Sequence, residues 1–472
     1  MNSARDRTIT APLSVNSAID GITWPGIPAP NGACLFAILF QLEQSQWWAP
    51  HEISRRQRDQ LQALLGHART HVPFYRERLR DFGDLPADET WPEVWRRIVP
   101  LTRAEIQAAD TDETMITQTL PPGHGELREI FTSGSTGKPI RSVRTQLWEL
   151  MWSAFTIRDH LWHRRDFLGT LATLRESGQG KALYPDGVLA ESWGYSSATI
   201  VKTGPMAGLN IMTPVEQQVE WLQRRDPDYL LTHPSIAQRL AIYCREHGVE
   251  LPRLKQVITI SENLKPEVRY AVREAWGVPL ADIYSTREIG YIALQCPNHE
   301  HYHVQSEHVL AEVLNETGEP CAPGEVGRLL VTSLHNLAMP LIRYDIGDFV
   351  EVGPPCPCGR GLPVIKRILG RTQNMLVMPS GERRWPLLSS ANIESMLAIN
   401  PEIRQYQFVQ KAPDLIELRL AGISALAADE ARLSAWVQAK FGAPFRVVFA
   451  YFDEIPRTAA GKFEDFICET EC

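Results

Sequence analysis

The chain has 472 residues, of which 44% are hydrophobic and 22% are charged, and its formal net charge is −8 at pH 7. This length exceeds what one hydrophobic core usually serves, so we expect two or more globular domains. The acidic balance, without a block of like charge, excludes the basic surface that nucleic-acid binding requires, and we predict no nucleic-acid partner.

The first fifty residues are rich in Pro, Gly, Ser and Asn, and they predict a mobile or surface-hugging lead-in. Their longest apolar run, Ala33–Phe40, is far shorter than the roughly 20 residues that a membrane-spanning helix needs, and we expect it to form a buried strand or a turn of helix. The run also lies behind Pro25, Pro28 and Pro30, too deep in the chain for the core of a signal peptide. We therefore expect a cytoplasmic protein without a membrane partner.

Helices and strands alternate through the middle of the chain. One helical stripe runs from His51 to Pro73, and a second runs through residues 147–161. The predicted strands that follow are Phe167–Leu171, Tyr229–Thr232 and Gln256–Ile260, and the helix that follows the last of them is Pro266–Trp276. This alternation predicts an α/β fold with a largely parallel sheet.

The pattern changes towards the C-terminus. Val309–Leu314 and Gly327–Thr332 flank a turn-rich segment and predict a hairpin. After residue 370 the sequence predicts two strands, then a helix over Ala431–Phe441 and a strand over Phe445–Phe452. These elements cover about 100 residues, the size of a small separate domain, and we place its boundary near Gly370–Gln373.

Residues 130–139 read Ile-Phe-Thr-Ser-Gly-Ser-Thr-Gly-Lys-Pro. Glycines let backbone N–H groups approach an anion, hydroxyls donate further hydrogen bonds, and a cation follows them. The segment therefore predicts a loop that binds phosphate groups, although a plain Ser/Gly surface loop is an alternative. A Walker A loop is excluded, because it needs a first Gly and a final Ser or Thr where this chain has Thr132 and Pro139.

This loop resembles the phosphate-binding signature of the adenylate-forming superfamily, which contains acyl-CoA ligases, peptide-synthetase adenylation domains and luciferases. Ile140 and Arg141 stand where the superfamily usually has a Lys, and this departure resembles the phenylacetate-CoA ligase branch, as does the segment His71–Arg76. The resemblance implies an α/β fold with a large multi-subdomain N-terminal adenylation domain over residues 1–369, whose helical lead-in runs to about residue 85. It also implies a hinge at residues 370–373 and a small α+β C-terminal lid domain over residues 374–472.

The resemblance further implies which residues bind ATP. The predicted phosphate-binding residues are Thr132, Ser133, Gly134, Ser135, Thr136, Gly137 and Lys138. In the segment Asp282–Glu288, Tyr284 is expected to stack on adenine, Thr286 to contact the α-phosphate and Glu288 to hold Mg²⁺. The remaining predicted nucleotide contacts in this region are Asp282 and Ser285 in the same motif, and Ser261 and Glu262 at the border of adenine and the acyl pocket.

Three positions closer to the C-terminus complete this set. Asp348 is expected to accept hydrogen bonds from both ribose hydroxyls. Arg371 belongs to the hinge motif, near the ribose and phosphates, and Gln373 stands where the hinge often has Asp. Lys462 is expected to contact the substrate carboxylate and the α-phosphate together and to stabilise the transition state. The predicted catalytic residues are Lys462, Glu288 and Thr286.

Cysteine spacing predicts a metal site. Cys296 stands in a histidine-rich stretch before the predicted hairpin, and Cys356 and Cys358 flank one proline after it. Because hairpin strands run out and back, the two clusters can meet as a closed, structural Zn²⁺ site of three thiolates and one imidazole. The favoured imidazole is His303, at the start of a predicted strand Val304–Leu314, and the alternative is His299. The alternative to a zinc site is two unrelated clusters of buried and surface thiols.

Together the motifs predict an enzyme that uses ATP and Mg²⁺ to convert a carboxylic acid into an acyl-adenylate and then transfers the acyl group. The resemblance favours CoA as the acceptor and an aromatic or other apolar acid as the donor, and it implies that the small domain rotates between the two steps. An amine acceptor would make the protein an amide-forming ligase, and a carrier-protein thiol would make it a loading enzyme. A non-catalytic module that binds nucleotide or zinc is a further alternative, and a homodimer is implied by family analogy only.

Overall fold

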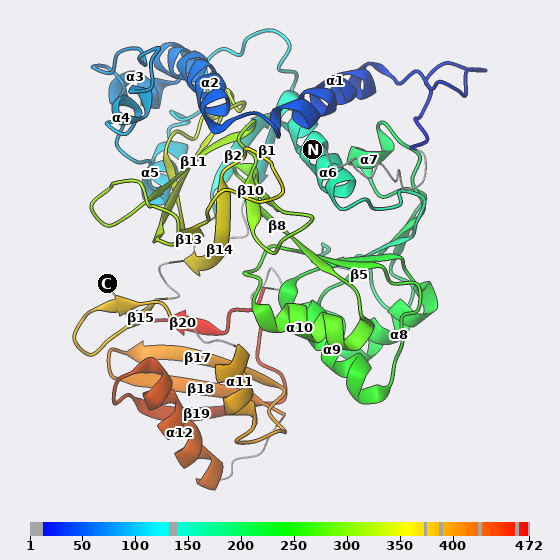
Figure 1. Ribbon diagram of the computed structural model, residues 1–472, viewed down its shortest axis with the longest axis vertical. Helices are drawn as coiled ribbons and strands as arrows, with labels where there is room; N and C mark the ends of the chain where they lie inside the picture. The colour runs from blue at the N-terminus through cyan, green and yellow to red at the C-terminus, as the bar shows by residue number, and fades with distance from the viewer. Residues whose placement is uncertain are drawn as a thin grey trace, which may run out of the picture.

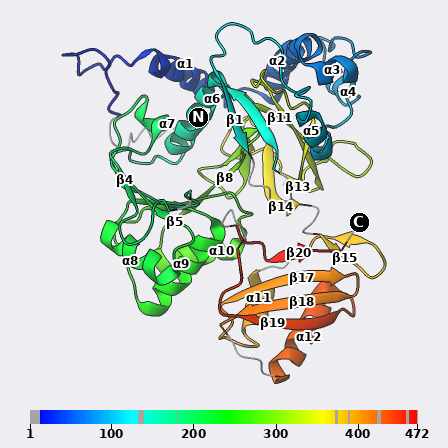
Figure 2. The same ribbon diagram turned by 180° about the vertical axis from the view of Figure 1, so that it is seen from behind.

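The computed structural model describes residues 13–131, 139–178, 180–371, 375–386, 390–422, 427–457 and 462–470. Residues up to 371 form a large part, and residues 375–470, here called the C-terminal unit, lie beneath it (Figure 1). In both views this unit sits below strand β14 (Val364–Arg371) and beside helix α10 (Pro266–Trp276) (Figure 2). Among the described helices, none combines the length and the apolar character needed to cross a membrane.

A 12-stranded sheet forms the centre of the large part, in the order β11-β12-β13-β14-β10-β9-β8-β7-β6-β3-β5-β4. Its remaining strands are β3 (Leu171–Arg175), β4 (Val188–Ala190), β5 (Met206–Asn210), β6 (Tyr229–Thr232), β7 (Gln256–Ile260), β8 (Leu280–Thr286), β9 (Gly290–Gln295), β10 (Tyr302–Val304), β11 (Val309–Leu314), β12 (Val326–Ser333) and β13 (Tyr344–Val352). Strands β5, β3, β6, β7 and β8 pair in parallel, whereas the strands beyond β8 pair antiparallel. Strands β1 (Leu127–Phe131) and β2 (Arg141–Thr145) form a separate two-stranded sheet.

The parallel half confirms the predicted alternation of strands and helices. Every residue of β7 is buried, as expected for a central strand covered on both faces. Helices α8 (Val215–Arg225), α9 (Pro234–His247) and α10 share one hydrophobic core with these strands. Gly248 and Gly277 end α9 and α10 in the left-handed conformation that glycine adopts without steric cost.

The helical segment over residues 61–109 packs against the antiparallel half (Figure 1). The helices before and around the first strands are α1 (Pro30–Ser45), α2 (Pro50–His71), α3 (Pro73–Arg78), α4 (Trp91–Trp95), α5 (Arg103–Asp110), α6 (Gln146–Trp162) and α7 (Tyr195–Ala198). The predicted lead-in is helical from Pro30 onward, and the apolar run Ala33–Phe40 lies within α1. Proline at the first position of a helix loses only an N–H that has no partner there, so Pro30 begins α1 instead of preventing it.

The predicted strand over residues 167–171 begins too early. Strand β3 starts at Leu171, because the chain before it forms a turn around Asp166. The Asp166 carboxylate accepts a 3.0 Å hydrogen bond from the backbone N–H of Leu168, and the Asp166 carbonyl accepts one of 3.0 Å from Gly169. Aspartate and glycine are typical turn residues for this reason.

The single strand predicted over residues 304–314 is two strands, β10 and β11. The backbone N–H groups of His308 and Val309 donate hydrogen bonds of 2.8 and 3.0 Å to the carbonyl of Gln305, which turns the chain between the strands. His303 consequently lies in the middle of the short strand β10, paired with Leu294 on β9 and Val364 on β14.

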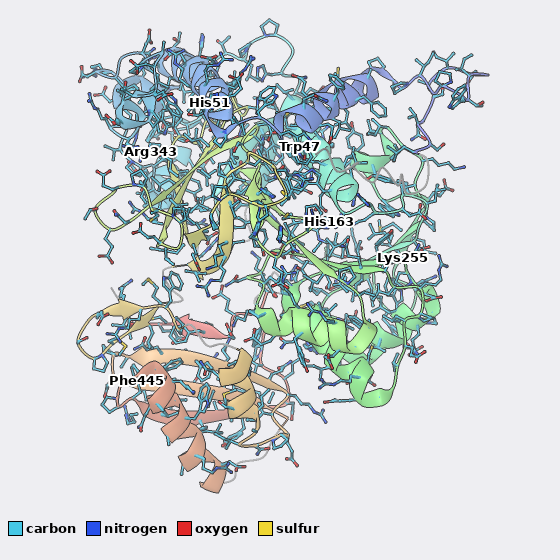
Figure 3. All side chains as sticks on the ribbon, viewed as in Figure 1. Trp47, His51, His163, Lys255, Arg343 and Phe445 are labelled. Atoms are coloured by element: carbon cyan, nitrogen blue, oxygen red, sulfur yellow. The ribbon has the colours of Figure 1, made fainter. Side chains whose placement is uncertain are left out.

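The C-terminal unit has its own four-stranded sheet in the order β19-β18-β17-β20. Its elements are β15 (Leu376–Val377), β16 (Arg383–Arg384), α11 (Ser390–Leu397), β17 (Gln405–Ala412), β18 (Leu415–Ala421), α12 (Ala427–Phe441), β19 (Arg446–Phe452) and β20 (Phe466–Cys468). The core between this sheet and the helices draws only on residues of the unit, and it includes the fully buried Phe445 (Figure 3). The unit therefore has a hydrophobic core separate from those of the large part.

Candidate active site

A cavity of about 750 Å³ lies where the large part meets the C-terminal unit. Its walls come from the ends of β7 and β8, from β13 and β14, and from residues 462–466. The carboxyl ends of parallel strands are where open α/β sheets generally bind ligands. The sequence-predicted residues that line this cavity are Ser261, Glu262, Asp282, Tyr284, Ser285, Thr286, Glu288, Asp348, Arg371 and Lys462.

The predicted phosphate loop, Thr132–Lys138, lies outside the described residues, as do residues 372 and 373 of the expected hinge. The residue directly before the loop is described. The carbonyl of Phe131 accepts a 3.1 Å hydrogen bond from Nη1 of Arg287. The loop therefore starts beside the turn that carries Thr286 and Glu288.

Tyr284, Asp348 and Arg371 form one hydrogen-bonded group in the cavity wall. The Tyr284 hydroxyl donates a 2.6 Å hydrogen bond to Oδ2 of Asp348. Asp348 and Arg371 are partners across β13 and β14, with Arg371 Nε 3.5 Å from Asp348 Oδ1. Burial and the nearby Asp348 carboxylate raise the pKa of Tyr284 well above its usual value. The arrangement presents a ring, a carboxylate and a guanidinium side by side, which suits a nucleoside.

The turn between β8 and β9 holds Thr286 and Glu288. Thr286 pairs with Gly290 across the hairpin, and its hydroxyl accepts a 3.1 Å hydrogen bond from the backbone N–H of Ile289. Glu288 is only 7% exposed although its side chain borders the cavity. A carboxylate held in this way is a hard oxygen ligand of the kind that Mg²⁺ takes.

Lys462 reaches the same cavity from the C-terminal unit. Burial lowers the pKa of Lys462, and the neighbouring Arg371 guanidinium lowers it further, while Glu262, Asp348 and Glu464 act in the opposite direction. The lysine thus lies among charged groups from both parts of the chain. Its position, unlike that of the other site residues, depends on how the C-terminal unit sits on the large part.

Glu262 has contacts that the sequence did not predict. Its Oε2 accepts a 3.0 Å hydrogen bond from the backbone N–H of Ser235, and its Oε1 accepts one of 2.7 Å from the backbone N–H of Phe463. Burial raises the pKa of this carboxyl group, but hydrogen bonding from His233 and the charge of Arg457 outweigh it, so the net shift is downward. The expected contact with adenine and the acyl pocket stays a prediction.

Of the three remaining predicted residues, Ser261 directly follows β7, and Asp282 and Ser285 lie within β8. Ser261 follows β7 with a φ of 79°, a left-handed conformation that a residue with a side chain adopts at some cost. Asp282 on β8 accepts hydrogen bonds of 2.5 Å from Thr259 and 2.7 Å from the Tyr302 hydroxyl. Burial raises the pKa of Asp282 to about 6 against the effect of these bonds.

Other residues of the cavity wall were missed from the sequence. They include Arg103, Trp152, Arg175 and Trp385, which come from separate elements with no local motif. Trp152 belongs to an aromatic group in which its ring centroid lies 4.7 Å from that of Tyr291 and 5.5 Å from that of Trp148. Of these three rings, Trp152 lines the cavity, and the buried Trp148 and Tyr291 pack behind it.

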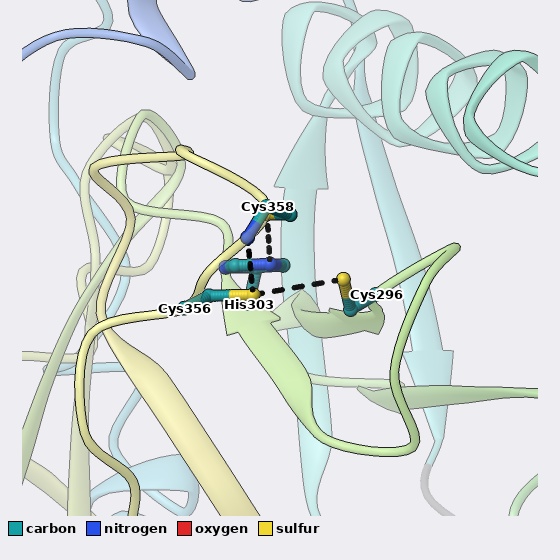
Figure 4. A group of neighbouring side chains, drawn as sticks. All are labelled: Cys296, His303, Cys356 and Cys358. Carbon is teal, nitrogen blue, oxygen red and sulfur yellow. Dashed lines mark hydrogen bonds between the residues drawn. The ribbon is translucent and has the colours of Figure 1, made fainter.

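The predicted metal ligands come together at one end of the antiparallel strands (Figure 4). One ligand atom from each of Cys296, His303, Cys356 and Cys358 lies within 4.8 Å of the others. His303 Nε2 is 3.4 Å from the Cys358 sulfur, and the sulfurs of Cys296 and Cys356 are 3.8 Å apart. Three thiols and one imidazole are the donor set of closed structural Zn²⁺ sites, so the described residues fit this ion.

His299, the alternative ligand, is not part of the cluster within the described residues. The neighbouring His301 is close to the cluster, with its Nε2 3.0 Å from the Cys356 sulfur. His303 offers the better ligand because its side chain is fully buried beside the three sulfurs.

The chain is similar to several known proteins. The family model of AMP-binding enzymes matches residues 128–339. The phenylacetate-coenzyme A ligase of Thermus thermophilus is 28% identical over 375 residues, which cover 75% of this chain and 77% of that protein. The phenylacetate-coenzyme A ligase of Escherichia coli is 26% identical over 343 residues, which cover 69% of this chain and 73% of that protein.

The fold has a counterpart of known structure. A crystal structure of 2-hydroxyisobutyryl-CoA ligase in the postadenylation state, in complex with 2-HIB-AMP, superposes with a TM-score of 0.69 at 20% sequence identity. The match covers 90% of this chain and 92% of that one. Residues 128–339 thus resemble AMP-binding enzymes, and most of the chain is similar in sequence to phenylacetate-coenzyme A ligases.

Proposed function

We propose that this protein is an acid–CoA ligase that activates an aromatic or other apolar carboxylic acid with ATP. In the first step a carboxylate oxygen attacks the α-phosphorus of ATP, and the bond to the bridging oxygen breaks to release pyrophosphate. In the second step the sulfur of CoA attacks the carbonyl carbon of the acyl-adenylate, and AMP leaves. The names of the phenylacetate-coenzyme A ligases that this chain resembles support both steps.

One observation carries the proposal. Lys462 of the C-terminal unit lines the same cavity as Glu288, Asp348 and Arg371 of the large part. A cation placed there would offset the negative charge that grows as a carboxylate approaches a phosphate, which is the main barrier of the first step. Tyr284 and Asp348, already joined by a hydrogen bond, would hold the adenosine through ring stacking and the ribose hydroxyls.

The phosphates would be held by the loop Thr132–Lys138, which starts beside Thr286. Glu288 is the residue that would hold Mg²⁺, and the ion would supply positive charge at the phosphates. Thr286 would donate its hydroxyl hydrogen to an α-phosphate oxygen, since that hydroxyl oxygen already accepts a bond from Ile289. Asp282, Ser261 and Ser285 would shape the adenine side of the cavity.

The aromatic group around Trp152 supports an aromatic acid as donor. Flat apolar rings pack favourably against such a wall in offset or edge-to-face geometry. The Trp152 and Tyr291 rings are tilted by 54° and have centroids 4.7 Å apart, which is an arrangement of this kind. A third ring from the substrate would extend it.

The C-terminal unit is proposed to be a lid domain that rotates about residues 370–373 between the two steps. Its separate core supports this, because such a unit can move as one body. Zn²⁺ is proposed to be held by Cys296, His303, Cys356 and Cys358 and to brace the ends of β9, β10 and the β13–β14 connection. Both steps are expected to take place in the cytoplasm.

The direct test is isotope exchange between pyrophosphate and ATP with a panel of aryl, heteroaryl and fatty acids, followed by mass spectrometry of products formed with CoA or with amines. An acid-dependent exchange and an acyl-CoA product are expected. Exchange with an amide as the only product would replace CoA by an amine acceptor. Absence of exchange with every acid, although ATP binds, would contradict the proposal and favour a non-catalytic nucleotide-binding module.

A further inference from the structure

The loop that carries Lys462 is tied to the large part by one buried carboxylate. Glu262 lies just beyond β7, and its side chain is only 4% exposed. Its Oε1 accepts the 2.7 Å hydrogen bond from the Phe463 backbone N–H. Because that N–H belongs to the planar peptide unit shared with Lys462, the bond fixes the backbone of the lysine itself.

A second contact from the same C-terminal segment reaches the same place. Nη1 of Arg457 lies 3.7 Å from Oε1 of Glu262 and donates a 2.7 Å hydrogen bond to the hydroxyl of Ser235. Glu262 therefore contacts the C-terminal segment both at Arg457 and at the peptide unit next to Lys462.

Glu262 is in turn fixed by the large part. Its Oε2 accepts the 3.0 Å hydrogen bond from the backbone N–H of Ser235, in the first turn of α9, and Nδ1 of His233 lies 3.7 Å from its Oε1. The N-terminus of a helix is a favourable place for a negative charge. The carboxylate is thus held in place by groups of the large part, and its Oε1 accepts a hydrogen bond from the C-terminal segment.

Two further contacts across the junction are ion pairs. Lys265 forms an ion pair with Asp465, and Arg239 Nη1 lies 2.5 Å from Glu454 Oε1. When the two parts separate, polar groups can form hydrogen bonds with water in place of these partners. An apolar interface would instead be exposed to water and lose its stabilisation. Contacts of this kind suit a junction that forms and breaks in each catalytic cycle.

We propose that Glu262 is a positioning residue that latches the Lys462 loop for adenylate formation and releases it before acyl transfer. This inference rests on the proposed function and deepens it. Glu262 contacts the backbone next to the lysine through Phe463, so it acts on the reaction through Lys462. Its loss is therefore expected to slow the first step far more than the second step, in which the lysine has withdrawn.

The test compares the two half-reactions in Glu262→Gln, a variant that keeps the size of the side chain and removes its charge. Acid-dependent pyrophosphate exchange is expected to fall by roughly ten- to a hundredfold, the effect of losing hydrogen bonds to a charged acceptor. Formation of acyl-CoA from CoA and the separately prepared adenylate of the best wild-type acid is expected to fall much less than exchange does, because Lys462 is not needed there.

Two further variants make the result specific. Arg457→Ala removes the partner on the other side of the junction and is expected to slow pyrophosphate exchange more than acyl-CoA formation. This variant keeps the test valid if Glu262→Gln does not fold. Glu246→Gln, an exposed glutamate on α9, is the matched control and is expected to leave both half-reactions unchanged. If folded variants lose both half-reactions equally, or lose neither, the proposed positioning role of Glu262 is overturned. A wild-type protein without exchange would instead contradict the proposed function.

Discussion

Tyr284 and Asp348, 64 residues apart in sequence, are joined by a 2.6 Å hydrogen bond in the cavity between the two parts of the chain. The bond leaves Oδ1 of Asp348 facing Arg371 at 3.5 Å, so the carboxylate is held in place from both sides. A preorganised acceptor of this kind suits a sugar with adjacent hydroxyls, because a carboxylate offers two oxygens as acceptors.

Asp348→Asn is expected to weaken ATP binding, because the amide has one acceptor oxygen where the carboxylate has two. Roughly a tenfold to hundredfold rise in the KM for ATP is predicted, with a smaller change in kcat. Steady-state kinetics of pyrophosphate exchange measures both. Asp345→Asn is the matched control on the same strand, since Asn keeps the oxygen that accepts from the Gly347 N–H. An unchanged KM for ATP in Asp348→Asn would contradict the proposal that Asp348 binds the ribose hydroxyls.

Purified protein is expected to contain one zinc ion per chain, measurable by metal analysis. Cys356→Ser is predicted to abolish stoichiometric zinc and to lower Tm by at least about 5 °C, because a structural ion stabilises the folded state that binds it. Cys34→Ser, in an exposed position of α1, is the control and should change neither quantity. Full zinc content in the Cys356 variant would eliminate the site.

Buried histidines make the stability of the protein depend on pH. Burial lowers the pKa of His308 to about 3 and that of His335 to about 4, from an ordinary value of 6.5. These groups are neutral when folded and take up protons when unfolded below pH 6.5. Stability is therefore complete above pH 6.5 and declines as pH falls towards these values, by at most about 1.4 kcal/mol per pH unit for each group.

The measurement is the urea midpoint of unfolding between pH 7.5 and 5.5. His308→Gln keeps a donor for the carbonyl of Ile289 and removes one titrating group, so a shallower decline is expected. His51→Gln, at an exposed position of α2, should leave the decline unchanged. A steeper or equal decline in His308→Gln would contradict the assignment.

Much of the fold and site could be predicted from local patterns. Strand β7 and helix α10 follow from an apolar run and a helical stripe, and the thiol cluster follows from the Cys-Pro-Cys spacing and the hairpin. The full extent of helix α1 was missed because its prolines signal a loop in isolation, although Pro30 is favourable at a helix start.

What local patterns cannot supply is contact between distant segments. Glu262 follows strand β7, whereas its partners at positions 235 and 463 lie on helix α9 and in the C-terminal unit. No local spacing in the sequence predicts these contacts. The same holds for Trp152 and Arg175 in the cavity wall. A family motif identifies a position, but only the packing of the elements shows what that side chain touches.

The most direct test of the account is adenylate formation by Lys462→Ala. The lysine lines the cavity from the C-terminal unit, and removal of its charge at the developing phosphate is expected to reduce acid-dependent pyrophosphate exchange by roughly a hundredfold or more. ATP binding should be retained, and Lys440→Ala on α12 should behave like wild type. Exchange at the wild-type rate in Lys462→Ala would contradict the central claim.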